Sequence, residues 1–109
     1  MATPRLRDKF PVPPLEQVEL PTVLRTVGEP IRLEMVRLLA DGRARPCHEI
    51  CEALGLPNST GSYHMRLLRE AGLTRVRPEG TERRISLRRE ELEQRFPGLV
   101  DVLVRDDRD

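Results

Sequence analysis

The stretch NSTGSYHMRLLREAGL, residues 58–73, carries the side chains whose types and spacing most clearly indicate chemistry. If this stretch is helical, a rotation of about 100° per residue places Ser59, Tyr63, Arg66 and Glu70 on one face, with Thr60 and Ser62 beside them. Short hydroxyls and an arginine can bond to phosphate oxygens, or to base edges in a DNA major groove, which is wide enough for a helix. A plainer interpretation stays open from these residues alone, in which they are helix caps and a solvated polar face.

The opposite face of the same stretch is expected to pack inward. It consists of Gly61, Met65, Leu68 and Gly72, with His64 at its edge. We interpret His64 as a partly buried structural histidine and not as a ligand. The side-chain oxygen of Asn58 or Ser59 is expected to cap the start of the helix.

Basic side chains are concentrated in and after this helix. Residues 66–89 contain eight arginines and three glutamates, whereas residues 1–65 carry equal numbers of basic and acidic side chains. The formal charge of the whole chain is only +1. A basic block inside a nearly neutral protein indicates a polyanionic partner.

Cys47, His48 and Cys51 form a second group with recognisable chemistry. Thiols four residues apart share one face of a helix, and the imidazole could supply a third ligand to a soft metal. The group is one ligand short of a structural zinc site, and cysteines at this spacing cannot form a disulfide without local unfolding. The three residues could be structural, redox-active or metal-binding, and we assign no metal site and no cofactor.

The elements that position these groups follow from apolar periodicity and from Gly and Pro breakers. Helical spacing over residues 18–27 is followed by EPIRLEMVRLLADG, by the short helix CHEICEALG ending at Gly55, and by the turn LPN. Two short helices joined by such a turn form a helix-turn-helix pattern. Alternating residues on both sides of PEGTE then predict a β-hairpin with Gly80 in its turn.

Two further apolar patterns raise the question of a second subunit. The segment EPIRLEMVRLLADG has apolar stripes on two sides, which indicates a helix buried on two sides and hints at a subunit interface. In the last segment, which Pro97 must kink or divide, one apolar stripe faces the rest of the monomer or a second copy. This stripe consists of Leu92, Phe96, Leu99, Val100 and Leu103.

Length and composition restrict the class of protein. At 109 residues the chain is one domain, expected as a flexible arm over 1–14, a folded domain over 15–105 and a disordered tail over 106–109. No apolar run approaches the roughly 20 residues of a membrane span, and the N-terminus lacks a signal-peptide core, so we expect a cytoplasmic protein. No acid/base pair, Ser/His/Asp arrangement or phosphate loop is present, so we do not expect an enzyme.

The segment PNSTGSYHMRLLREAGL resembles the recognition-helix signature of ArsR/SmtB-type winged helix-turn-helix repressors, roughly P-x-S-T-V-S-x-H-L-x-x-L-x-x-A-G-L. GEPIRLEMVRLLADG is similar to the preceding helix of that family, and RPEGTERRISLR is similar to its wing. The resemblance covers roughly residues 20–105 and departs at Gly61, where valine is usual. The paired thiols of the arsenic and cadmium sensors and the His/Asp spacing of the zinc sensors are not reproduced.

This resemblance implies a mainly α fold with a small β-hairpin, a winged helix-turn-helix whose terminal helices form a homodimer. It implies a sequence-specific, double-stranded-DNA-binding repressor that acts by occluding its operator. The alternatives are a winged-helix protein-interaction module and a thiol- or metal-responsive sensor variant. The sequence identifies neither the operator nor any effector. We expect the DNA contacts to be Ser59, Thr60, Ser62, Tyr63 and Arg66 at bases and phosphates, with Arg77, Arg83 and Arg84 at flanking phosphates.

Overall fold

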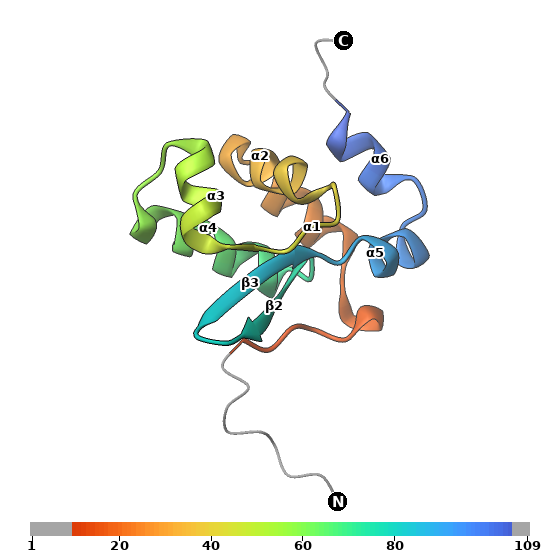
Figure 1. Cartoon of the computed structure of the whole chain (residues 1–109). Coiled ribbons are helices and arrows are strands. Elements are labelled where there is room, and N and C mark those ends of the chain that lie inside the picture. Colours follow the sequence, from red (N-terminus) through yellow and green to blue (C-terminus); the bar gives the residue numbers. More distant parts are fainter. Residues whose placement is uncertain (1–9, 106–109) are drawn as a thin grey trace, which may run out of the picture.

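A three-stranded antiparallel sheet lies at one edge of a group of short helices, and its hairpin projects beyond them (Figure 1). The structure is a computed structural model that describes residues 10–105. Its helices are the 3₁₀ turn Leu15–Gln17, α1 (Leu20–Val27), α2 (Pro30–Leu39), α3 (Cys47–Leu54), α4 (Asn58–Glu70), α5 (Arg89–Arg95) and α6 (Leu99–Val104). Its strands are β1 (Arg45–Pro46), β2 (Thr74–Glu79) and β3 (Glu82–Leu87), in the order β1-β3-β2. The predicted mainly α fold with one hairpin is confirmed.

The boundaries of these elements follow the local sequence. Pro21 lies in the first turn of α1, and Pro30 is the first residue of α2, where the missing N–H costs nothing. Glu29 caps α2, because its carboxylate accepts hydrogen bonds from the backbone N–H groups of Ile31 and Arg32. Gly80, with φ +64°, makes the turn between β2 and β3. The prediction was that Pro97 kinks or divides the last segment, and it divides this segment into α5 and α6.

The core lies between the helices and the inner face of the sheet. Both apolar sides of α2 contribute to the core of the monomer, since Met35, Val36 and Leu39 have no exposed surface. The other members of the two stripes pack against this core but are only partly buried, so a subunit interface on α2 stays a prediction; they are Ile31, Leu33, Leu38 and Ala40. The stripe of α5 and α6 also faces the monomer, because Leu92, Val100 and Leu103 are buried there.

Two features differ from the predicted elements, and two predicted segments lie wholly or partly outside the described residues. The strand β1 falls in a stretch that showed only a polar break, and it pairs with β3 through Arg45 opposite Ile85. The first helix begins at Leu20, two residues later than its spacing indicated. Residues 1–9 of the expected arm and the expected tail 106–109 lie outside the described residues. Residues 11–14 have no helix or strand, and the Pro13 carbonyl accepts a hydrogen bond from Arg88.

Candidate nucleic-acid interface

The turn between α3 and α4 fixes where the polar helix begins. Gly55 ends α3 in the left-handed conformation, with φ +67°, and its N–H and that of Leu56 bond back to the last turn of α3. Pro57 then holds an extended conformation, with ψ 149°, and α4 starts at the next residue. This sequence of caps gives the helix-turn-helix unit that the pattern predicted.

The predicted cap of α4 by Asn58 or Ser59 is wrong. The capping position is occupied by Pro57, whose side chain has no acceptor, and both expected residues already belong to the helix. No side chain in the described part of the chain caps α4. Its first-turn N–H groups therefore have no side-chain partner, and a helix start of this kind has the dipole and the donors to bind an anion.

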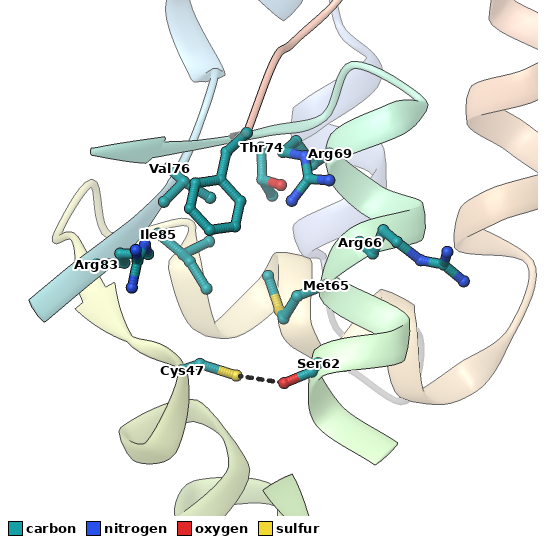
Figure 2. Close-up of a pocket in the computed structure, with 10 residues that line it drawn as sticks. Cys47, Ser62, Met65, Arg66, Arg69, Thr74, Val76, Arg83 and Ile85 are labelled. Carbon is teal, nitrogen blue, oxygen red and sulfur yellow. Dashed lines mark hydrogen bonds between the residues drawn. The ribbon is translucent and has the colours of Figure 1, made fainter. Parts of the chain in front are cut away.

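The outer face of α4 is polar and accessible, as predicted. Ser59, Ser62 and Arg66 are exposed, Thr60 is half-buried, and 51% of the Tyr63 surface is accessible. The Arg66 guanidinium carbon lies 5.7 Å from the centre of the Tyr63 ring, so the two side chains form one cation–π unit on the outer surface. Figure 2 shows the Arg66 guanidinium directed away from the hairpin.

The inner face of α4 is held by close packing and by one histidine. Met65 and Leu68 are buried, as predicted, and a methyl group added at Gly61 would overlap the Cys51 sulfur. Glycine at position 61 therefore permits the close approach of α3 and α4. The sequence showed only that this glycine departs from the valine of the signature, and it did not indicate this packing role. His64 is buried, and its Nδ1 accepts from Arg32 Nη1 at 3.1 Å, because a guanidinium can only donate. This contact ties α4 to α2, which agrees with the structural interpretation of His64.

The hairpin places its arginines on two different faces. Pro78 pairs with Arg83, and Arg77 pairs with Arg84. Because side chains alternate along a strand, Arg83 shares the face of Thr74, which looks toward α4, whereas Arg77 and Arg84 lie on the opposite face. The three predicted phosphate contacts therefore do not form a single patch.

Four arginines of the basic block are engaged within the protein. Arg84 Nη2 bonds to Glu82 at 2.9 Å, and its Nε lies 3.2 Å from Glu79. Arg89 donates to the Ala40 carbonyl and approaches Asp101. The other two, Arg75 and Arg88, share the carboxylate of Glu91.

Arg88 is the most deeply buried of these arginines and fixes the base of the hairpin. Its guanidinium donates to Glu91 and to the carbonyls of Pro13 and Gly72. The hydrogen bond from Arg88 lowers the pKa of Glu91 below its usual value, and the charges of Arg88 and Arg75 act in the same direction. The carboxylate is therefore held ionised between two guanidinium groups.

The remaining arginines, Arg66, Arg69, Arg77 and Arg83, form no ion pair among residues 10–105. Sequence reasoning missed Arg69, whose place one turn after Arg66 puts it at the side of α4 that faces the hairpin. It also missed Phe10, whose ring centre lies 5.2 Å from the Arg69 guanidinium carbon and 5.0 Å from that of Arg83. The only sequence signal for Arg69 was its membership of the basic block.

The cysteine group does not form a metal site in the described residues. The sulfur atoms of Cys47 and Cys51 are 3.8 Å apart and are both free thiols. His48 is exposed, and within residues 10–105 no three His, Cys, Asp or Glu side chains gather to hold a metal ion. Burial raises the pKa of Cys51 to about 11, with further contributions from Cys47, so this thiol is protonated at neutral pH. Cys47 Sγ also lies 3.8 Å from the Ser62 hydroxyl (Figure 2).

Comparisons with known proteins connect this geometry to DNA-binding regulators. A family model described as a helix-turn-helix domain matches residues 27–77. The chain is 32% identical over 82 residues to the HTH-type transcriptional regulator YceK of Bacillus subtilis, covering 74% of this chain and 82% of that protein. It is 31% identical over 75 residues to the transcriptional repressor SmtB of Mycobacterium tuberculosis, covering 67% of this chain and 55% of that protein.

A solved structure shows the same architecture. The homodimeric winged helix-turn-helix DNA-binding domain of Mb0332 from Mycobacterium bovis, a possible ArsR-family transcriptional regulator, superposes with a TM-score of 0.66 at 30% identity. The match covers 77% of this chain and 76% of the other. In the part of the chain that the structure describes, no helix is long and apolar enough to cross a membrane.

Proposed function

We propose that this chain, which belongs to the ArsR/SmtB family of winged helix-turn-helix transcriptional regulators, is a cytoplasmic homodimer that represses transcription by covering its operator. Each protomer would insert one α4 into a major groove and lay its hairpin along the adjoining backbone. The observation that carries this proposal is the outer face of α4, an uncapped helix start followed by hydroxyls and an arginine that no described acid neutralises.

The proposed contacts divide by chemistry. The hydroxyls of Ser59, Thr60 and Ser62 and the first-turn N–H groups suit phosphate oxygens, while the stacked Tyr63 and Arg66 side chains suit base edges. On the hairpin, Arg83 continues the surface of α4 and suits a flanking phosphate. Arg77 serves the same purpose from the other face of the wing.

Arg84 takes a different place in this proposal. Its guanidinium is already neutralised by Glu79 and Glu82, so it would gain less from a DNA phosphate than Arg77 or Arg83. We therefore propose that Arg84 mainly holds the shape of the hairpin and contacts DNA as a secondary partner.

Exposed apolar side chains support a dimer through the terminal helices. Leu20 and Leu24 lie one turn apart on α1 and are both exposed, and Val102 on α6 is 66% exposed. These residues, and not the buried stripe of α5 and α6, would meet a second copy. The homodimeric state of the Mb0332 domain is consistent with this arrangement.

Fluorescence anisotropy tests the proposed function. The protein would be titrated against a labelled duplex from just upstream of its own gene and against a scrambled duplex, both at about 0.15 M salt. Tight binding with at least a hundredfold preference for the native duplex is expected from typical specific recognition. Equal, weak binding to both duplexes would contradict repression at this site and would favour the protein-interaction module.

A further inference from the structure

A cavity of about 210 Å³ lies between α4 and the hairpin. Its walls include the side chains of Met65 from the helix and of Val76 and Ile85 from the two long strands, which Figure 2 shows directed into one space. The thiol of Cys47 closes the end nearest α3. The greater part of the lining is therefore apolar.

Two polar groups inside this apolar lining have no partner. Thr74 is 0% exposed, and its Oγ1 has no hydrogen bond in the described part of the chain. Register places Thr74 on the same hairpin face as Val76 and Ile85, and all three residues line the cavity. The Nε of Arg69, which also lines the cavity and lies beside Thr74 in Figure 2, is buried and likewise without a partner among residues 10–105. Buried donors are normally satisfied, so these two groups indicate that an acceptor belongs beside them.

The charges around the cavity specify the sign of that acceptor. Arg69 and Arg83 both line it, none of its lining residues is acidic, and neither guanidinium has an ion-pair partner in the described chain. The Phe10 ring lies against both guanidinium groups, about 5 Å from each carbon. The two guanidinium groups at the rim therefore suit an anionic ligand, and they already contact the aromatic ring of Phe10.

We propose that this cavity binds a small organic monocarboxylate with an apolar body about the size of a benzene ring. The carboxylate would accept from Arg69 Nε and from Thr74 Oγ1, and the body would lie against Met65, Val76 and Ile85. An apolar cavity of about 150 Å³ holds benzene, so 210 Å³ leaves room for the carboxylate as well. Inorganic phosphate would leave the apolar walls uncovered, and a neutral hydrocarbon would leave both donors unpaired.

Occupancy of the cavity has a consequence for regulation, and this part rests on the proposed DNA binding. Ser62 and Arg83, which are proposed DNA contacts, both line the cavity. A bound carboxylate attracts Arg83 away from the phosphate backbone and neutralises part of the basic surface. The ligand therefore binds the free protein more tightly than the DNA complex, and by linkage it weakens DNA binding by the same factor.

The binding site is tested without DNA, by methyl and amide NMR of the full chain titrated with sodium benzoate. Benzamide, which has the same shape and no charge, and acetate, which lacks the apolar body, are the comparison probes. Benzoate is expected to shift Thr74, Met65 and Ile85 saturably, with an affinity at least tenfold higher than that of either comparison probe. Benzoate and benzamide binding alike, shifts confined to other surfaces, or no shifts would each overturn the proposal.

Two variants distinguish a loss of benzoate binding at the cavity from a loss of folding. Thr74→Val keeps the shape and removes only a hydroxyl that has no partner, so the protein stays folded while benzoate affinity falls about tenfold. Arg69→Met is expected to give a loss of similar size. Thr81→Val, at an exposed position in the hairpin turn, is the matched control and leaves the affinity unchanged. Unchanged benzoate binding in both Thr74→Val and Arg69→Met would overturn the assignment.

A DNA titration with and without saturating benzoate then tests the regulatory part. Wild-type protein is expected to lose at least threefold in DNA affinity, and Thr74→Val is expected to lose less at the same benzoate concentration. DNA binding that benzoate leaves unchanged would overturn the regulatory consequence while the NMR result stands. Absence of specific DNA binding in either condition would instead overturn the proposed function.

Discussion

The inner and outer faces of the unit formed by α4 and the hairpin use the same residue types in opposite ways. On the inner face, Arg88 donates to a carboxylate and to two carbonyls, and His64 accepts from Arg32. On the outer face of α4, Arg66 has no acidic partner among the described residues, and Arg83 beside the cavity has none either. The paired inner groups therefore contribute to stability, whereas Arg66 and Arg83 remain available for a ligand. An arginine cluster in a sequence does not distinguish these two uses, because the distinction lies in the partners.

The largest effect on stability is expected at the base of the hairpin. Arg88→Met would remove the donor of four hydrogen bonds and leave Glu91 with Arg75 alone, so the free energy of unfolding should fall by about 3 kcal/mol. Arg83→Met is the matched control and should change it by less than about 0.5 kcal/mol. Urea unfolding measures both. Equal losses in the two variants would remove the distinction between paired and unpaired arginines.

Packing on the inner face is tested at Gly61. Gly61→Ala should lower the free energy of unfolding by about 2 kcal/mol, because its new methyl group meets the buried Cys51 sulfur. In the Cys51→Ala background the same change should be neutral or stabilising, because alanine favours a helix by about 1 kcal/mol over glycine. A double-mutant cycle by thermal or urea unfolding gives the coupling. Additive effects would show that the two side chains do not share this space.

On the outer face, Arg66→Ala should act on DNA and not on stability. If Arg66 bonds to a guanine edge, the variant loses about 1–3 kcal/mol of binding to the operator and discriminates less between bases. Arg43→Ala, at an exposed position in the loop before β1, is the control and should bind like the wild type. Anisotropy with operator and random duplexes separates the outcomes. An equal loss on both duplexes would assign Arg66 to a phosphate instead.

The two faces of the hairpin predict a smaller difference between neighbouring arginines. Arg83→Ala should weaken binding to all duplexes alike and should reduce the slope of log K against log salt by about one unit. Arg84→Ala should reduce it by less, because Glu79 and Glu82 already neutralise this guanidinium. Anisotropy over a series of salt concentrations gives both slopes. A larger change for Arg84 would reverse the assignment of the wing faces.

The smallest effect is expected in the dependence of thermal stability on pH under acidic conditions. The pKa of Glu91 is lower in the folded protein than in the unfolded chain, where it is about 4.3, because Arg88 and Arg75 favour the carboxylate. Its stabilising contribution is therefore complete above that value and is lost as pH falls through the lower folded pKa. Glu91→Gln should flatten the fall in thermal midpoint below about pH 5. A wild-type profile in the variant would show that other carboxylates govern acid unfolding.

Patterns in the chain predicted those elements whose signal is local. The helix-turn-helix, the hairpin around Gly80 and the buried side of α4 all follow from apolar periodicity and breakers within a few residues. The strand β1 could not be predicted because its partner, Ile85, lies 40 residues away. The predicted cap of α4 was wrong because the helix begins earlier than expected. Asn58 is already its first residue, so Pro57 occupies the cap position.

Parts of the candidate site could not be predicted for a similar reason. The polar face of α4 was visible in the sequence, since its exposure needs only helical geometry. The separation of paired from unpaired arginines was not visible, because Arg88 finds its acceptors at Pro13 and Gly72, far from each other in the chain. The cavity beside Thr74 likewise requires α4 and both long strands together.

The contact between Cys51 and Gly61 restricts the order in which related sequences can change. A bulkier residue at position 61 lowers stability while the sulfur is present, so a descendant avoids that loss only if it first shortens the side chain at position 51. Valine at 61, the residue in the signature that this segment resembles, is therefore separated from this sequence by a less stable intermediate. Among relatives of this chain, the residues at the two positions are expected to vary together, and sequences that combine cysteine at 51 with valine at 61 should be rare.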